Sequence, residues 1–256
     1  MAPEVPGEAT YLDLLARARA DPAVLGVVLT GSRGRGVFVR SDSDWDVRLF
    51  VDDVTGVRER FETAHGSPVE AVVVPYDALD RLADPASSSA WDRYSYVHAT
   101  VAFDRTDGDF ERSIAEMETL APDTGRAVAA AALDDYINSY VRSLKNERVG
   151  LTVESLLDAG ESIDPLLTTL FAVHGRVRPF NKFLGWELET HPLPGDGWTA
   201  SRVLARLATI QSTGAVRDQA ELFRDVEALA RDAGYGDVVD SWEPDVPWLR
   251  SGVARD

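Results

Sequence analysis

The sequence predicts a small α/β domain with a mixed sheet, of the α+β or α/β class, followed by an all-α helical domain. Before Pro122, short apolar runs typical of strands alternate with segments of helical spacing. Beyond Pro122, the recognisable segments all carry helical spacing and are separated by Gly, Pro and Asp. We therefore place a boundary near residue 123, with an α/β domain over residues 1–123 and a helical domain over residues 124–256.

The elements of the first domain follow from apolar patterns and chain breakers. A helix is predicted over residues 11–20, with Leu12, Leu15 and Ala16 on one stripe, and Asp21-Pro22 ends it. The almost wholly apolar run 23–29 suits a strand buried on both faces. The other predicted elements are a loop over 30–43, strands over 44–51, 69–74 and 96–103, and a helix over 54–64. This order of helices and strands indicates a mixed sheet.

The helical domain is predicted from 3.6-residue periodicity alone. Its expected helices cover residues 127–148, 154–175, 180–189, 201–212 and 218–233.

Composition excludes several classes of protein. With 26 Lys and Arg against 43 Asp and Glu, the net charge of −17 argues against nucleic-acid and membrane-surface partners, which need clustered basic side chains. The absence of Cys excludes disulfides, thiolate zinc sites and a Cys nucleophile. No apolar run approaches the roughly 18 residues of a spanning helix, and the N-terminus lacks signal-peptide features. We expect a cytoplasmic protein, a monomer or a homodimer.

The segment most informative about chemistry runs from the end of the first strand into the second. Thr30-Gly31-Ser32-Arg33-Gly34-Arg35-Gly36 is followed by Ser41-Asp42-Ser43-Asp44-Trp45-Asp46. Period-2 alternation places Asp44 and Asp46 on one face of the strand and Trp45 on the other. Two such carboxylates suit a shared cation, and oxygen ligands of this kind favour Mg²⁺.

A third acid, Glu70, starts the apolar strand 69–74. If that strand lies beside residues 44–51, three acids converge and can hold one or two metal ions for attack on phosphorus. Gly31 and Ser32 would let an anion approach the backbone closely, and Arg33 and Arg35 would add charge-assisted hydrogen bonds. The Walker loop is absent, and the glycines lead into a strand rather than a helix, which excludes a dinucleotide fingerprint.

Together these residues resemble the polymerase-β-type nucleotidyltransferase superfamily. The Gly31-Ser32 loop and the Ser41-Asp42-Ser43-Asp44-Trp45-Asp46 segment are similar to those of its small bacterial members. Val69-Glu70-Ala71-Val72-Val73-Val74 resembles the third-carboxylate strand of aminoglycoside adenylyltransferases of the streptomycin/spectinomycin kind. One departure is Trp45, which replaces the small aliphatic residue usual between the aspartates.

The resemblance implies roles for these residues. Asp44 and Asp46 would bind Mg²⁺, Glu70 would be a metal ligand or the general base, and Gly31 and Ser32 would hold the triphosphate of ATP. In the helical domain, Lys182 is expected to contact the β- and γ-phosphates, with Lys145 as the other candidate. Glu161, read as opening a helix, is a second candidate base.

The predicted function is transfer of AMP from ATP to a hydroxyl of a small, cationic acceptor such as an aminoglycoside, with release of pyrophosphate. The overall acidity is compatible with a basic acceptor. Two alternatives stay open. One is a regulatory protein adenylyltransferase of the antitoxin kind, and the other is a nucleotide-binding module without catalysis.

Overall fold

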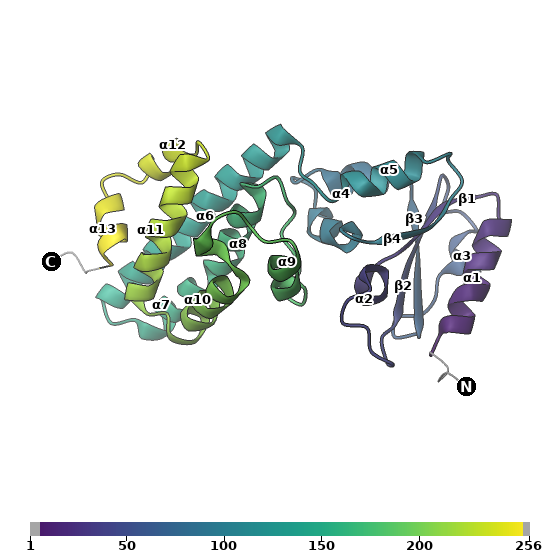
Figure 1. Ribbon diagram of the computed structural model, residues 1–256, viewed down its shortest axis with the longest axis horizontal. Helices are drawn as coiled ribbons and strands as arrows, with labels where there is room; N and C mark the ends of the chain where they lie inside the picture. Colours follow the sequence, from purple (N-terminus) through teal and green to yellow (C-terminus); the bar gives the residue numbers. More distant parts are fainter. Residues whose placement is uncertain (1–5, 253–256) are drawn as a thin grey trace. The chain divides into compact units, whose positions relative to one another are not determined.

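The chain divides into two compact units at the junction between Thr119 and Leu120 (Figure 1). The computed structural model describes residues 6–252. The first unit contains a sheet with helices on both of its faces, and the second is entirely helical. The predicted fold class is confirmed.

Four strands form the sheet of the first unit, in the order β3-β2-β1-β4. They are β1 (Val24–Leu29), β2 (Trp45–Val51), β3 (Val69–Pro75) and β4 (Thr100–Asp104). Strand β1 pairs antiparallel with β2 and β4, whereas β2 and β3 are parallel. The sheet is therefore mixed, and β1 is buried along almost its whole length, as its apolar sequence predicts.

The connecting segments of the first unit are short. They are α1 (Glu8–Ala20), α2 (Gly31–Arg35), α3 (Arg58–Phe61), α4 (Ala78–Ala83), the 3₁₀ helix η1 (Ala90–Tyr96) and α5 (Asp109–Glu116). The sequence predicts α1 but assigns the wrong stripe to it, because Leu12 is exposed and Leu14 is buried. Helix α2 lies in the segment predicted as a loop, and the helix predicted over 54–64 shortens to α3.

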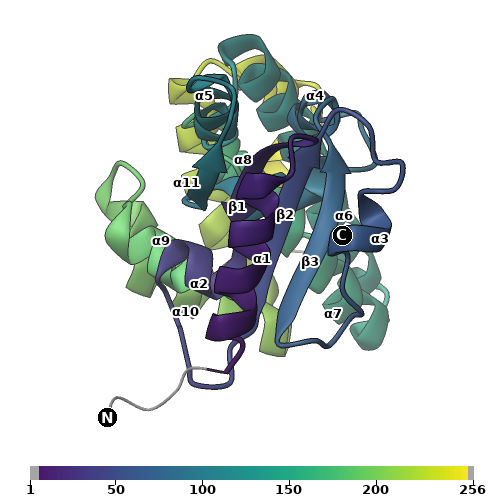
Figure 2. The same ribbon diagram turned by 90° about the vertical axis from the view of Figure 1, so that its right-hand side faces the viewer.

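The two faces of the sheet are covered differently. Figure 2 shows α1 lying over β1 and β2, and the residues of this face form one core cluster that includes Val47 and Leu49. The opposite face packs against α4, η1 and α5 in a second cluster that includes Phe50 and Phe110. Gly26 lies in the middle of β1 because an added Cβ would overlap the ring of Phe110.

The second unit is a bundle built around one long helix. Its helices are α6 (Pro122–Arg148), α7 (Thr152–Glu161), α8 (Ile163–Ala172), α9 (Leu184–Thr190), η2 (Asp196–Trp198), α10 (Ala200–Thr213), α11 (Val216–Asp232), α12 (Gly236–Asp240) and α13 (Val246–Ser251). Helix α6 packs against α7 and α8. The helix predicted over 154–175 is two helices, which are separated at Ser162.

A buried carboxylate ties α13 to α11 in this unit. The side chain of Glu227 is 8% exposed and accepts hydrogen bonds from Arg250 Nε at 2.7 Å and from Arg231 Nε at 2.8 Å. The hydrogen bond from Arg250 is the largest cause that lowers the pKa of Glu227.

Within the described part of the chain, none of the helices combines the length and apolar character needed to cross a bilayer.

Candidate active site

Gly31 packs directly against the carboxylate of Asp46. The Thr30 N–H donates to the Asp46 carbonyl at 2.8 Å, which ties the end of β1 to the start of β2. Gly31 has φ +64°, and an added Cβ would lie far inside 3.0 Å of Asp46 Oδ2. Gly34 is equally confined, because its Cβ would overlap the Leu29 carbonyl. The glycines of this segment therefore allow α2 to begin beside a carboxylate.

Trp45 and Asp46 lie next to each other on strand β2, and their side chains point to opposite faces of the sheet. The Trp45 ring stacks on Tyr11 with centroids 4.3 Å apart, and its indole N–H donates to the Pro6 carbonyl at 3.1 Å. The Arg33 guanidinium covers the Trp45 ring at 4.5 Å. By the alternation of the strand, Asp46 lies on the opposite face. Trp45 is thus a packing residue on the α1 side of the sheet, and its ring does not lie on the face that contains Asp46.

Glu70 lies beside Asp46 in the parallel pairing of β2 with β3. Its Oε1 accepts the Gly66 N–H at 2.6 Å and lies 3.1 Å from His65 Nδ1. The hydrogen bond from Gly66 is the largest cause that lowers the pKa of Glu70. The adjacent strands that we predicted are present, and they bring the two backbone positions together on one face of the sheet.

The side chains of the three acids have different surroundings. Among residues 6–252, no three His, Asp or Glu side chains are close enough to hold one metal ion. The convergence of Asp44, Asp46 and Glu70 on one metal ion stays a prediction. Asp44 is exposed and precedes β2, so strand register does not hold it, and the Glu70 carboxylate binds the loop before β3.

The residues expected to hold the triphosphate lie on α2, and its two arginines also have structural contacts. Ser32 is 5% exposed. Arg33 donates from Nε and Nη2 to the Ser43 carbonyl, at 3.1 and 2.8 Å. Arg35 donates to the carbonyls of Gly31 and Tyr94, and its guanidinium lies over the Tyr94 ring. These contacts fix the segment between β1 and β2.

The candidates from the helical domain all lie in the second unit. Lys182 is exposed, with its ammonium 5.4 Å from the ring centroid of Phe183. Lys145 is exposed on α6. Glu161 is the last residue of α7 and pairs with Arg142, so it ends a helix rather than opening one.

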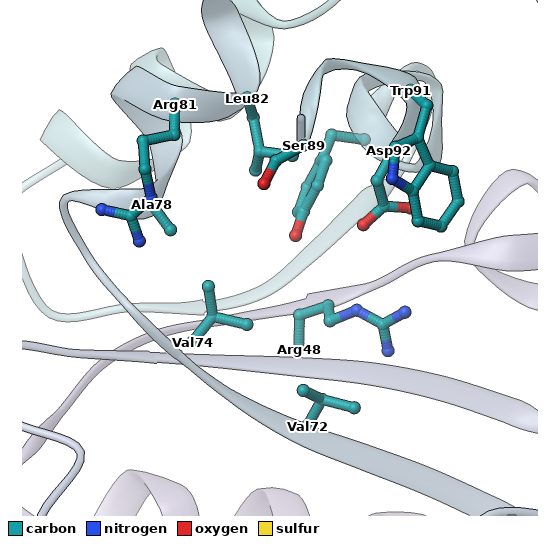
Figure 3. A pocket seen from close by; sticks show the side chains of 10 residues that line it. Arg48, Val72, Val74, Ala78, Arg81, Leu82, Ser89, Trp91 and Asp92 are labelled. Carbon is teal, nitrogen blue, oxygen red and sulfur yellow. The ribbon is translucent and has the colours of Figure 1, made fainter. Parts of the chain in front are cut away.

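A pocket of about 270 Å³ lies on the same face of the sheet as Asp46. Arg48 comes two residues after Asp46 on β2 and lines this pocket together with Val72 and Val74 of β3 (Figure 3). Trp91 and Asp92 line it from the segment of η1. The sequence reasoning missed this pocket. The available signal was Arg48, a charge on the aspartate face of an otherwise apolar strand.

Tyr96 closes the inner side of the pocket. Its side chain is buried, and burial is the largest cause that raises its pKa to about 12. The charge of Asp92 acts in the same direction, whereas a hydrogen bond with Arg48 lowers the pKa. The Tyr96 hydroxyl therefore stays protonated at neutral pH. It can form hydrogen bonds in the pocket but does not act as a base.

Comparison with known proteins finds similar solved structures. The chain is similar to a nucleotidyltransferase-like protein from Exiguobacterium sibiricum 255-15, with 13% sequence identity and a TM-score of 0.44 over 97% of this chain and 92% of that one. No protein-family model matches the sequence, and no curated protein matches it significantly.

Proposed function

We propose that this chain is a Mg²⁺-dependent nucleotidyltransferase that moves AMP from ATP to a hydroxyl of a small acceptor. The observation that carries the proposal is the close packing of Gly31 against the Asp46 carboxylate. Asp44 lies two residues earlier, and Glu70 is paired with Asp46 on the next strand. A glycine loop held against an acidic strand end is suited to phosphoryl chemistry, because it would let a phosphate approach a metal-binding carboxylate.

The residues present fit a magnesium ion. Mg²⁺ is commonly bound by one or two carboxylates, water and substrate phosphates, so Asp44 and Asp46 suffice without Glu70. Because Gly31 has no Cβ, the Asp46 carboxylate packs directly against the backbone of the glycine loop. When bound, the ion would neutralise charge on the phosphates and orient them for in-line displacement.

In the proposed reaction the acceptor oxygen bonds to the α-phosphorus of ATP. The bond between that phosphorus and the oxygen bridging to the β-phosphorus breaks, and pyrophosphate leaves with the electron pair. The acceptor proton passes to the Glu70 carboxylate. The lowered pKa of Glu70 keeps that carboxylate ionised at neutral pH and makes it a weaker base than an ordinary glutamate.

Several parts of the proposal come from the family resemblance described above. These are the choice of ATP, the contact of Lys182 with the phosphates, and an acceptor of the aminoglycoside kind. The net charge of −17 is compatible with a cationic acceptor but would favour any basic molecule. These parts are therefore tested separately from the transfer reaction itself.

The experiment is label transfer from α-labelled ATP, GTP, CTP and UTP in the presence of Mg²⁺. The acceptors are streptomycin, spectinomycin, kanamycin and a cell extract. Label on a small molecule supports the proposal. Label on one extract protein supports a regulatory protein adenylyltransferase, and nucleotide binding without transfer supports a non-catalytic module.

Variants identify the site in the same assay. We expect Asp44→Asn and Asp46→Asn to lose transfer. Asp42→Asn is the matched control, because Asp42 is an exposed aspartate of the same segment that pairs with Arg40. If transfer survives in both Asp44→Asn and Asp46→Asn at the level of Asp42→Asn, the site assignment is wrong.

A further inference from the structure

The pocket near Asp46 is lined by both charged and apolar side chains. Arg48 rises from β2, with Val72 and Val74 next to it on β3 (Figure 3). Trp91 and Asp92 line the opposite side, and Trp91 is 74% exposed. A small molecule with an apolar body can therefore enter past Trp91 and reach the guanidinium of Arg48.

The position of the pocket suits binding of the acceptor in the proposed reaction. Helix α2 follows β1, whereas the pocket lies over β2 and β3, so the two lie on opposite sides of Asp46 across the sheet. In phosphoryl transfer the attacking and leaving oxygens lie roughly in line. If pyrophosphate leaves on the α2 side, the acceptor attacks from the side of Glu70 and the pocket.

The pocket contains two arginines, Arg48 and Arg81. Among the described residues, Arg81 pairs with Asp77 at 3.3 Å, whereas Arg48 forms no ion pair. The groups that influence or face Arg48 are the Tyr96 hydroxyl, the Glu70 carboxylate and Asp92. Asp92 Oδ1 accepts a hydrogen bond from Ser95 Oγ at 2.5 Å. A guanidinium has five N–H donors, so Arg48, which forms no close ion pair, keeps donors for a bound oxyanion.

We propose that Arg48 binds an oxyanion, a carboxylate or a phosphate, carried by the acceptor whose hydroxyl receives the nucleotide. Arg48 is thus a specificity-determining residue of the acceptor site. This inference rests on the proposed nucleotidyl transfer. It gives the acceptor a group of opposite charge to the one that the aminoglycoside resemblance implies. Valine side chains beneath and the indole of Trp91 above would contact the body of the acceptor.

The first test separates acceptors by charge. A deproteinised small-molecule extract is divided by ion exchange at pH 7 into anionic, cationic and neutral pools, and each pool receives the same saturating labelled ATP and Mg²⁺. We expect transfer with the anionic pool. Transfer with the cationic or neutral pool alone overturns the inference and leaves the proposed function standing. Transfer with none of the pools, nor with the three drugs, overturns the proposed function and this inference with it.

The two sources of the oxyanion are distinguished by treating the anionic pool with a phosphatase, which is removed before ATP is added. Transfer that survives the treatment identifies a carboxylate. Transfer that is lost identifies a phosphate. Both results support an anionic acceptor, and they direct its purification differently.

The second test uses variants of the full chain. Loss of a charge-assisted hydrogen bond predicts that Arg48→Gln lowers kcat/KM for the anionic pool by about 10- to 100-fold, with the Kd for ATP unchanged. Arg48→Lys should fall between Arg48→Gln and the wild type. The matched control is Arg58→Gln, an exposed arginine of α3 that pairs with Glu62 at 3.4 Å, and it should behave as the wild type.

Thermal unfolding checks that the variants fold. If Arg48→Gln does not fold, Arg48→Lys and the pool assay with the wild-type chain still decide the question. Unchanged kcat/KM for the anionic pool in a folded Arg48→Gln variant would overturn the assignment of Arg48.

Discussion

Replacement of Gly31 by alanine tests the site most directly, because the structure separates two consequences of the added methyl group. The first is backbone strain, since Gly31 has φ +64°, and a left-handed conformation costs an L-residue roughly 1–2 kcal/mol. The second is the overlap of the new Cβ with Asp46 Oδ2, which lies well inside the 3.0 Å that Cβ atoms require. To relieve the overlap, the carboxylate must move by on the order of 1 Å, and such a misplacement of a reacting group costs about 100-fold in rate.

Gly36 provides the matched control for this variant. It has φ +67° at the end of the same short helix, but an added Cβ meets no atom within 4 Å. Gly31→Ala and Gly36→Ala should therefore share the strain and a similar loss of unfolding free energy, measured by urea denaturation. Only Gly31→Ala should lose about 100-fold in label transfer from α-labelled ATP. Equal transfer rates in two folded variants would show that the contact between Gly31 and Asp46 has no part in the reaction.

Three other predictions follow from single contacts. Glu70→Gln should lower transfer by about 10²- to 10⁴-fold if this carboxylate takes the acceptor proton, whereas His65→Ala should change it little, as measured by initial rates. Glu227 has a pKa below its ordinary 4.5, so its ionised form stabilises the fold above that pH, and the stabilisation is lost as pH falls through the lowered folded-state value. Urea midpoints of Glu227→Gln from pH 2 to 6 should therefore depend less on pH than those of the wild type. Gly26→Ala should destabilise the first unit by about 1–3 kcal/mol through overlap with Phe110, and addition of Phe110→Leu should recover part of the loss in thermal unfolding.

Strands β1 and β2 could be predicted because the burial of their faces determines the pattern of apolar residues in the sequence. The run 23–29 is apolar on both faces and becomes β1, and the alternation after Asp44 becomes β2. Helix α2 could not be predicted in this way. It has five residues, three of them glycine or serine, and no apolar stripe. Its position follows from tertiary contacts, above all the close approach of Gly34 to the Leu29 carbonyl.

Helix ends and faces were predicted less well, because local propensity does not determine them. Residues 154–175 carry continuous helical spacing, yet the chain separates into α7 and α8 at Ser162, whose hydroxyl donates to the Ala159 carbonyl. Leu12 lies at a helical spacing from Leu15 but is exposed, since α1 turns Leu14 toward the sheet instead. Which apolar residues are buried depends on the surface that receives the helix.

Some parts of the candidate site could be predicted from the sequence and others could not. Asp44, Asp46, Gly31 and Glu70 could be proposed from the sequence because they lie in adjacent segments that begin or end strands. The pocket was missed because its walls come from distant parts of the sequence. The orientation of the Glu70 carboxylate was missed as well, since it depends on the Gly66 N–H in the turn before β3.

The pocket over the sheet is itself a reason to propose function there. Helices α4 and α5 pack over Phe50, whereas Arg48 faces a pocket between the sheet, α4 and the segment of η1, and Val72 beside it is 41% exposed. Stability alone would favour apolar residues at these strand positions under a covering helix, because burial of each such side chain contributes about 1.5–3 kcal/mol. The chain instead keeps two charged residues on this face of β2 and leaves the pocket open. A sheet face that forgoes this stabilisation beside a glycine loop is suited to bind a substrate, and apolar replacements at Arg48 should stabilise the first unit while they remove acceptor binding.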